Sequence, residues 1–279
     1  MTGPGWPPAR PPVALTVAGS DSGGGAGIAA DLRTFAAHGV WGTCAVTAVT
    51  AQNTVGVQAV EILPAGSVAA QMAAVAADIG VDAAKTGMLG GAAVVEAVAA
   101  AVVEWDLHPL VVDPVTVASS GAALLSPDGV DVVRRLLLPL ADLVTPNLAE
   151  AAALADWPEP PGDRAGMERL AGAVLALGPG AVLVTGGHLP GTDTPDLLVR
   201  PGGGGGVESV WLPGRRVDTR NTHGTGCVLS AAITARLARG ETLLQAVEGA
   251  KTFVTAAIAA GVELGAGPGA VNPSGSFPP

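Results

Sequence analysis

Two kinds of hydrophobic pattern alternate along the chain. Short apolar runs, typical of buried β-strands, are followed by longer segments in which apolar residues recur every three or four positions, the period of an α-helix. In the segment 28–38, for instance, Ile28, Leu32 and Phe35 fall on one face of a helix. The pattern predicts strands at 13–18, 43–51, 57–63, 83–86, 110–112, 142–145 and 181–185, helices at 28–38, 64–79, 94–105, 146–154, 164–177, 225–238 and 242–260, and a helix start at Ser126-Pro127.

Strands that alternate with helices predict an α/β fold, in which helices cover both faces of a mostly parallel sheet. Ligands of such folds bind at the carboxyl ends of the strands, so the residues that follow each strand are the candidates for a site. Segments 196–199 and 208–212 are instead predicted to form a hairpin, with the glycine run 202–206 as its surface loop.

No repeat or linker divides residues 13–272, which are predicted to form a single domain. Residues 1–12 are rich in proline and are predicted to be a disordered lead-in, without the basic start and apolar core of a signal peptide. Residues 273–279 are predicted to be a flexible tail.

Composition narrows the classes of function. The formal net charge is −10, and no basic stripe is present to neutralise phosphates, which argues against nucleic-acid binding. No run of about 18 apolar residues lacks charges or breakers, so no membrane span is predicted. The two cysteines are Cys44, which lies in a strand-like run, and Cys227; this usage favours a reduced, cytoplasmic protein.

The most informative segment is the turn 221–227, which precedes a small, apolar helical run. A glycine-rich turn that opens a helix presents unpaired N–H groups and the positive end of the helix dipole, and so predicts an anion site, most often for phosphate. Cys227 ends the turn, and its position at a helix N-terminus suggests a lowered pKa that would help to deprotonate an alcohol. The alternative is an ordinary glycine turn with a small buried cysteine. His223, inside the turn, is interpreted as structural rather than as a metal ligand.

Other strand ends carry further candidates. The glycine cluster 19–27 follows a strand and opens a helix, but it has neither the Walker nor the Rossmann spacing, so a phosphate loop and a tight packing turn both remain open. Asp113 closes a buried strand, and Asn147 and Glu150 share a face at a helix start; such oxygen ligands suit magnesium. The alternatives are a helix cap for Asn147 and a solvated charge for Glu150.

Eight blocks in this order give the chain a specific resemblance. They begin at Ala18-Gly19-Ser20-Asp21, Ala30-Asp31-Leu32, Thr50-Ala51-Gln52-Asn53, Lys85-Thr86-Gly87-Met88, Val112-Asp113-Pro114-Val115, Thr145-Pro146-Asn147, Gly186-Gly187-His188 and Asn221-Thr222-His223-Gly224. Over residues 13–272 the chain resembles the ribokinase-like superfamily, and within it the hydroxymethylpyrimidine and phosphomethylpyrimidine kinases of thiamine biosynthesis.

The resemblance implies a ribokinase-like three-layer αβα sandwich and a kinase that uses ATP and Mg²⁺. The anion hole and catalytic group would be Gly224, Thr225, Gly226 and Cys227, where most sugar kinases of the superfamily end the turn with aspartate. Substrate contacts are implied for Gly19, Asp31, Gln52, Met88 and Val115, nucleotide contacts for Asn147, Thr185, Gly187, His188 and Thr222, and magnesium contacts for Asp113 and Glu150.

The implied reaction is phosphorylation of 4-amino-5-hydroxymethyl-2-methylpyrimidine, and then of its monophosphate to the diphosphate. Two positions depart from the family: Thr185 stands where a lysine is common, and Thr116 where a methionine is common. The alternatives are a pyridoxal kinase on the same scaffold and a pyrimidine- or nucleotide-binding protein without catalysis, which Thr185 keeps open. The resemblance also implies a small-molecule substrate and a homodimer.

Overall fold

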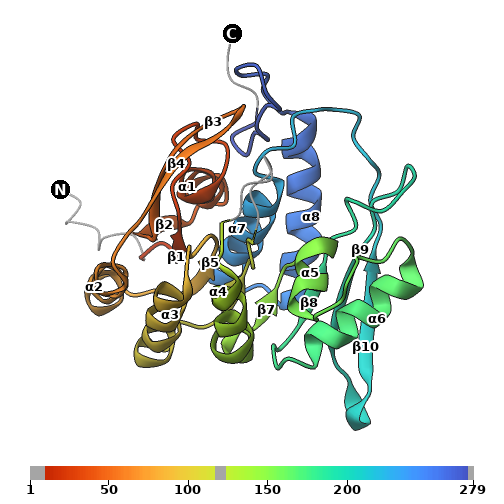
Figure 1. Ribbon diagram of the computed structural model, residues 1–279, viewed down its shortest axis with the longest axis horizontal. Helices are drawn as coiled ribbons and strands as arrows, with labels where there is room; N and C mark the ends of the chain where they lie inside the picture. The colour runs from red at the N-terminus through yellow and green to blue at the C-terminus, as the bar shows by residue number, and fades with distance from the viewer. Residues whose placement is uncertain (1–9, 117–123, 276–279) are drawn as a thin grey trace, which may run out of the picture.

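The computed structural model describes residues 10–116 and 124–275, which form a three-layer αβα sandwich (Figure 1). The strands of the central sheet, in spatial order, are β10 (Val207–Leu212), β9 (Asp196–Pro201), β8 (Val182–Val184), β7 (Leu143–Val144), β6 (Leu110–Val112), β5 (Ala83–Thr86), β1 (Val13–Ala18) and β2 (Trp41–Val46). Neighbours from β2 to β8 pair in parallel, whereas β9 pairs antiparallel with β8 and with β10. The predicted mostly parallel sheet and the predicted hairpin of 196–199 and 208–212 are therefore confirmed.

Helices cover both faces of this sheet. One face carries α1 (Gly27–Ala37), α7 (Thr225–Ala238) and α8 (Leu243–Ala259), and the other carries α2 (Ala65–Asp78), α3 (Ala92–Trp105), α4 (Pro127–Val132), α5 (Leu148–Leu154) and α6 (Arg164–Leu175). A π-helical turn (Val133–Leu137) and a 3-10 turn (Leu138–Leu140) continue α4. The predicted helices are all present, with ends that differ by a few residues.

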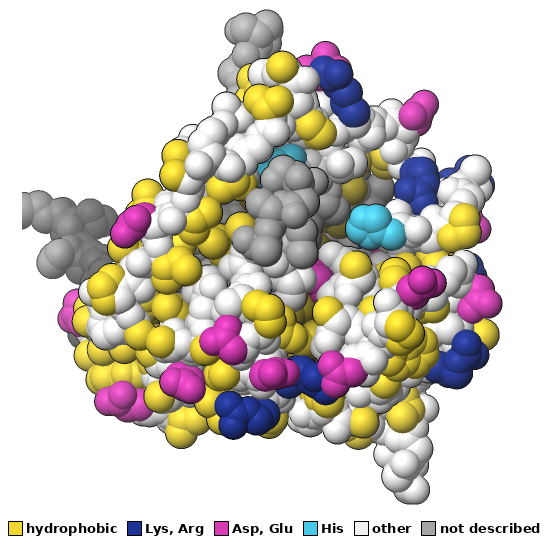
Figure 2. Space-filling view, viewed as in Figure 1, with side chains coloured by type: hydrophobic (Ala, Val, Ile, Leu, Met, Phe, Trp, Pro, Cys, Tyr) yellow, Lys and Arg dark blue, Asp and Glu magenta, His cyan; other side chains and the backbone are white. Residues whose placement is uncertain are grey.

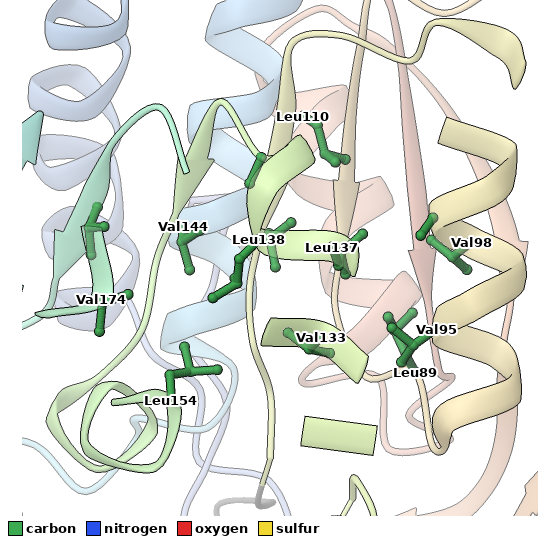
Figure 3. Close-up of a cluster of buried hydrophobic side chains, with 14 of the residues drawn as sticks. Leu89, Val95, Val98, Leu110, Val133, Leu137, Leu138, Val144, Leu154 and Val174 are labelled. Atoms are coloured by element: carbon green, nitrogen blue, oxygen red, sulfur yellow. The ribbon is translucent and has the colours of Figure 1, made fainter. Parts of the chain in front are cut away.

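The larger hydrophobic cluster lies between the sheet and α2 to α6. In Figure 3, Val95 and Val98 of α3 point toward Leu89, Val133 and Leu137, all of which are buried. Strand residues alternate between the two faces, so Val112 packs in this cluster while its neighbour Val111 packs under α7 and α8. The same alternation determines which polar side chains of the strands face α7.

The strand predicted at 43–51 is wrong as a single element. It breaks at Thr47, whose N–H donates to Ala18 O (3.0 Å) and whose Oγ1 donates to Met88 O (2.6 Å). The chain then leaves the sheet as β3 (Ala48–Asn53), which pairs with β4 (Gly56–Ile62) in a separate two-stranded sheet, hereafter the flap. The apolar pattern runs on through Thr47 and so carries no sign of the break.

The ends of the described chain are tied to the domain. Arg10 forms an ion pair with Asp82 (3.1 Å), and Pro12 O accepts from Trp41 N, so this part of the predicted lead-in is ordered; residues 1–9 lie outside the described residues. Asn272 accepts from Ser274 N within the predicted tail, of which 276–279 lie outside the described residues. The described helices include none that is both long and apolar enough to cross a membrane.

Candidate active site

The glycine-rich turn meets the carboxyl ends of the parallel strands at the start of α7. The chain enters this helix through Gly224, whose φ of 84° lies in the left-handed region. A Cβ atom at this position would also overlap the carbonyl oxygen of Gly25. Both backbone conformation and packing therefore require glycine at residue 224.

The first turn of α7 has free N–H groups. Val228 N donates to Gly224 O (2.9 Å), and Thr225 N donates to Thr222 O (3.3 Å). Within 10–116 and 124–275, no acceptor pairs with the N–H groups of Gly226 or Cys227. Gly226 is exposed, and unpaired N–H donors at the positive end of a helix dipole are suited to holding an anion.

His223 and Asp21 join this turn to the glycine cluster at 19–27. His223 Nε2 lies 2.8 Å from Asp21 Oδ2, and the same carboxylate accepts from the N–H groups of Gly23, Gly25 and Ala26. Burial acts to raise the pKa of Asp21, but its hydrogen bonds and the nearby His223 outweigh burial and lower it. The interpretation of His223 as structural is confirmed, and the packing-turn reading of the glycine cluster accounts for these contacts.

Cys227 is half-buried at the first turn of α7, and its sulfur faces the N–H of Gly27. Burial, with the charges of Asp31 and Asp113, raises the pKa of the thiol to about 12 against the lowering effect of Lys85. The predicted lowering of the Cys227 pKa is therefore wrong for this structure. The position at a helix N-terminus favours a thiolate, but removal of solvent outweighs it.

Beneath the turn lies a buried ion pair. Lys85 Nζ is 2.9 Å from Asp31 Oδ1, both side chains have an exposed fraction of 0%, and Thr16 Oγ1 donates to Asp31 Oδ2 (2.6 Å). Asp31 was predicted to contact a substrate ring, but its side chain has no exposed surface, and the structure shows it as the partner of Lys85. The sequence motifs imply no separate role for Lys85, although a lysine inside an otherwise buried strand is unusual and marks the residue as a candidate.

Of the other four predicted substrate positions, Gly19 and Met88 follow β1 and β5, Gln52 lies on the flap and Val115 follows β6. Gly19 N donates to Met88 O (3.1 Å), and a Cβ at Gly19 would lie 2.9 Å from Met88 Sδ, so these two residues are in contact. Gln52, on the flap, is bound through its backbone to Ser22 Oγ (2.8 Å). Val115 is half-buried beyond β6 and lines a cavity of about 10 Å³ behind the site.

The two residues predicted to contact magnesium, Asp113 and Glu150, both have buried carboxylates. Asp113 Oδ2 accepts from Ser230 Oγ (3.0 Å), and Glu150 Oε2 accepts from Asn147 N (2.9 Å). Burial and the charge of Asp113 raise the pKa of Glu150 to about 8. The reading of Glu150 as a solvated charge is therefore wrong. The hydroxyls of Thr86 and Thr145, at the ends of β5 and β7, are buried without a partner among the described residues.

Three predicted nucleotide positions lie at neighbouring strand ends. Asn147 caps α5 through a capping box with Glu150, which confirms the helix-cap reading, and it forms a parallel bridge with Thr185. Gly187, the third of these positions, is exposed. The other two predicted nucleotide positions are also exposed: His188 lies on the loop after Gly187, and Thr222 lies in the glycine-rich turn.

Two cations that sequence reasoning missed hold the loop after Thr185. Arg216 donates to the carbonyl oxygens of Gly187, Leu189 and Gly191. Lys251 lies 2.5 Å from Asp196, whose other oxygen accepts from Gly186 N (2.9 Å). No local sequence pattern marks either residue.

Comparison with known proteins gives consistent results. The family model that matches residues 21–272 describes phosphomethylpyrimidine kinase. A hydroxymethylpyrimidine/phosphomethylpyrimidine kinase of Streptomyces coelicolor is 50% identical over 272 residues, which are 98% of this chain and 97% of the relative.

Solved structures are also similar. An ADP complex of Bacillus subtilis pyridoxal kinase has a TM-score of 0.86 at 38% identity and covers 95% of this chain and 98% of its own. A phosphomethylpyrimidine kinase of Clostridium difficile has a TM-score of 0.75 at 38% identity, with coverages of 88% and 99%.

Proposed function

This chain belongs to the phosphomethylpyrimidine kinase family, and on that premise we propose that it uses ATP to phosphorylate 4-amino-5-hydroxymethyl-2-methylpyrimidine and then the monophosphate to the diphosphate. The observation that carries the proposal is the first turn of α7, where the N–H groups of Gly226 and Cys227 have no acceptor among the described residues and the buried carboxylate of Asp113 lies close to Gly226. We propose that residues 13–272 act as one catalytic domain.

In the proposed reaction, the hydroxymethyl oxygen attacks the γ-phosphorus, the bond from that phosphorus to the bridging oxygen breaks, and ADP leaves with the electron pair. The N–H groups of Gly226 and Cys227 donate to the oxygens of the transferred group. A thiol whose pKa is about 12 keeps its proton near neutral pH, so Cys227 contacts the acceptor oxygen without acting as a strong base. The alcohol proton then passes to an oxygen of the transferred phosphoryl group.

We propose that Asp113 and Glu150 hold Mg²⁺. Their oxygen donors match its preference, and both carboxylates are buried without a cation bound directly to either among the described residues, which suits a site completed by a metal. When bound, the ion would neutralise phosphate charge. Asn147, Thr185, Gly187, His188 and Thr222 are proposed to face the nucleotide, and Gly19, Gln52, Met88 and Val115 the pyrimidine.

A coupled assay of ADP release tests the function. The purified protein is given Mg²⁺-ATP with hydroxymethylpyrimidine or with its monophosphate, and we expect turnover of both. Absence of turnover of either pyrimidine would overturn the proposal; tight binding of both ligands without ADP would instead indicate a binding protein.

Pyridoxal phosphorylation is a second candidate because the Bacillus subtilis relative of this fold is a pyridoxal kinase. Side-by-side turnover of pyridoxal and hydroxymethylpyrimidine separates the two functions. We expect the pyrimidine to have the higher kcat/KM, and the opposite order would favour the second candidate.

We also propose a homodimer and a cytoplasmic location. The flap exposes Val49 (51%), Val60 (39%) and Ile62 (46%), and Figure 2 shows hydrophobic side chains gathered on that side of the molecule. Sedimentation equilibrium tests the dimer, and a monomer at all concentrations would refute it.

Unpaired Cys44 and Cys227 support a reducing compartment, which fractionation of cells tests.

A further inference from the structure

Lys85 is a buried cation with no role in the steps of the proposed reaction described above. It is one of two lysines in the chain, and among the described residues it is the only lysine or arginine that is fully buried. The buried ammonium donates to Asp31, while its remaining N–H directions have no partner among the described residues. Because an unpaired or half-paired buried charge is costly, its position calls for an explanation beyond packing.

The strand register places Lys85 under the first turn of α7. Thr16 of β1, Lys85 of β5 and Val111 of β6 are neighbours across the sheet, and Val111 packs against α7. Asp113 lies two residues beyond Val111, so it faces the same side of the sheet, where Ser230 of α7 donates to it. The ammonium therefore lies between Asp31 of α1 and the glycine-rich turn that we propose to bind the anion.

We propose that Lys85 is a positioning residue of the transfer site, whose buried ammonium supplies positive potential to the Cys227 sulfur and the first turn of α7, while the Asp31 carboxylate opposes it. This proposal rests on the proposed kinase function, because the role of the Lys85 charge would be to stabilise negative charge on the transferred phosphoryl group. No bond is made or broken at Lys85, and it stays protonated throughout.

The Cys227 thiol reports this potential without any substrate. The charged groups that face it are Lys85 from β5, Asp31 from α1 and Asp113 from the end of β6. Lys85 favours the thiolate, whereas the two carboxylates disfavour it. Since the thiolate is the form that alkylating reagents attack, the alkylation rate measures the local potential.

The experiment measures the rate of iodoacetamide addition to Cys227 at one mildly alkaline pH, by intact mass, in a Cys44→Ala background. We expect Lys85→Met to slow alkylation and Asp31→Asn to speed it, each by about threefold for every unit of pKa change. Lys251→Met, which removes the other lysine from its ion pair with Asp196, is the matched control and should leave the rate unchanged.

A purely structural role for the Lys85–Asp31 pair predicts a different result. Loss of either side chain would then loosen the site, and alkylation of Cys227 would be faster in both variants. Faster alkylation in both variants, or an unchanged rate in both, would overturn the proposal. If Lys85→Met does not fold, the double variant Lys85→Met/Asp31→Asn decides: without either charge it should alkylate more slowly than the parent, because the lysine has the larger effect. An equal or faster rate in a folded double variant would contradict the proposal.

Kinetics connect the potential to catalysis. We expect the double variant to lower kcat for the pyrimidine about tenfold while the KM changes little. Since alkylation needs no substrate, a parent protein that alkylates as expected but turns over no pyrimidine would refute the kinase function and leave the electrostatic assignment of Lys85 intact.

Discussion

His223 Nε2 lies 2.8 Å from Asp21 Oδ2, a contact between side chains 202 positions apart in the chain. Asp21 also binds the N–H groups of its own loop, so one carboxylate fixes both glycine-rich loops. The glycine cluster and the glycine-rich turn also pack closely, because a Cβ at Gly25 would overlap the His223 ring. The glycine-rich turn 221–227 is therefore held from its side by the loop that follows β1.

Replacing Asp21 should destabilise the fold as well as the site. In Asp21→Ala the N–H groups of Gly23, Gly25 and Ala26 lose their acceptor, and we expect the free energy of unfolding to fall by about 2–4 kcal/mol in urea titrations. Asp21→Asn retains a carbonyl acceptor and should lose less. Equal stability of Asp21→Ala and the parent would show that the two loops hold their form without this carboxylate.

Two neighbouring glycines should respond differently to alanine. Gly224→Ala places a Cβ against Gly25 O at a positive φ, so we expect a large loss of stability. Gly226→Ala meets only Asp113 Oδ2, at 4.0 Å, and should fold with a stability within about 1 kcal/mol of the parent. Its exposed methyl group should instead raise the KM for ATP. Thermal melts and initial rates check both variants, and a stable Gly224→Ala would contradict the packing argument.

Cys227→Ala should lower kcat modestly. A general base contributes about 10²–10⁴-fold, but a thiol with a pKa of about 12 is a poor one, so we expect a fall in kcat of about tenfold with little change in the KM for the pyrimidine. Steady-state kinetics with Cys44→Ala as the control measure this. A fall of a thousandfold would show that the thiol is deprotonated in the complex, and an unchanged kcat would show that it only packs.

The sequence pattern was sufficient for the sheet and for α7, whose bounds agree with the predicted 225–238. A long run of small and apolar residues directly after a glycine-rich turn leaves few alternatives there. It was insufficient at Thr47, where hydrogen bonds to Ala18 at the end of β1 and to Met88 beyond β5 break an apolar run that looks continuous. Such contacts depend on residues distant in the chain and leave no local signal.

The same limit applies to the site. The type and order of the motifs identified which residues gather at the strand ends, but not which of them are buried. The Asp31 motif implies a ligand contact because it says nothing of Lys85, which lies 54 positions away. The pKa of Cys227 was predicted from the helix dipole alone, and burial, which depends on the whole fold, reversed its direction.

Glu150 should govern the magnesium requirement. Glu150→Gln keeps an acceptor for Asn147 N but removes a metal-binding charge, so we expect the Mg²⁺ concentration for half-maximal rate to rise about tenfold or more. The control is Glu104→Gln, which removes one negative charge from an exposed residue of α3. Titration of the initial rate with Mg²⁺ at saturating ATP measures the effect. An unchanged requirement would remove Glu150 from the metal site.

His38 should make the protein less stable in mild acid. The ring is buried, its Nδ1 is 2.9 Å from Thr34 O, and its centroid is 4.4 Å from that of Phe253. Burial, helped by the charges of Arg236 and Arg239, lowers the pKa of His38. The unfolded chain therefore takes up this proton near pH 6.5, before the folded protein does, and stability is lost as the pH falls from there toward the folded pKa.

His38→Gln is uncharged at every pH and should remove this loss. We expect the drop in unfolding free energy between about pH 7 and about pH 5 to be smaller in the variant than in the parent, from urea titrations at both pH values. His188→Gln, at an exposed histidine, should retain the drop of the parent. If His38→Gln and the parent lose the same stability over this range, the acid sensitivity arises from other groups, and the buried ring does not contribute to it.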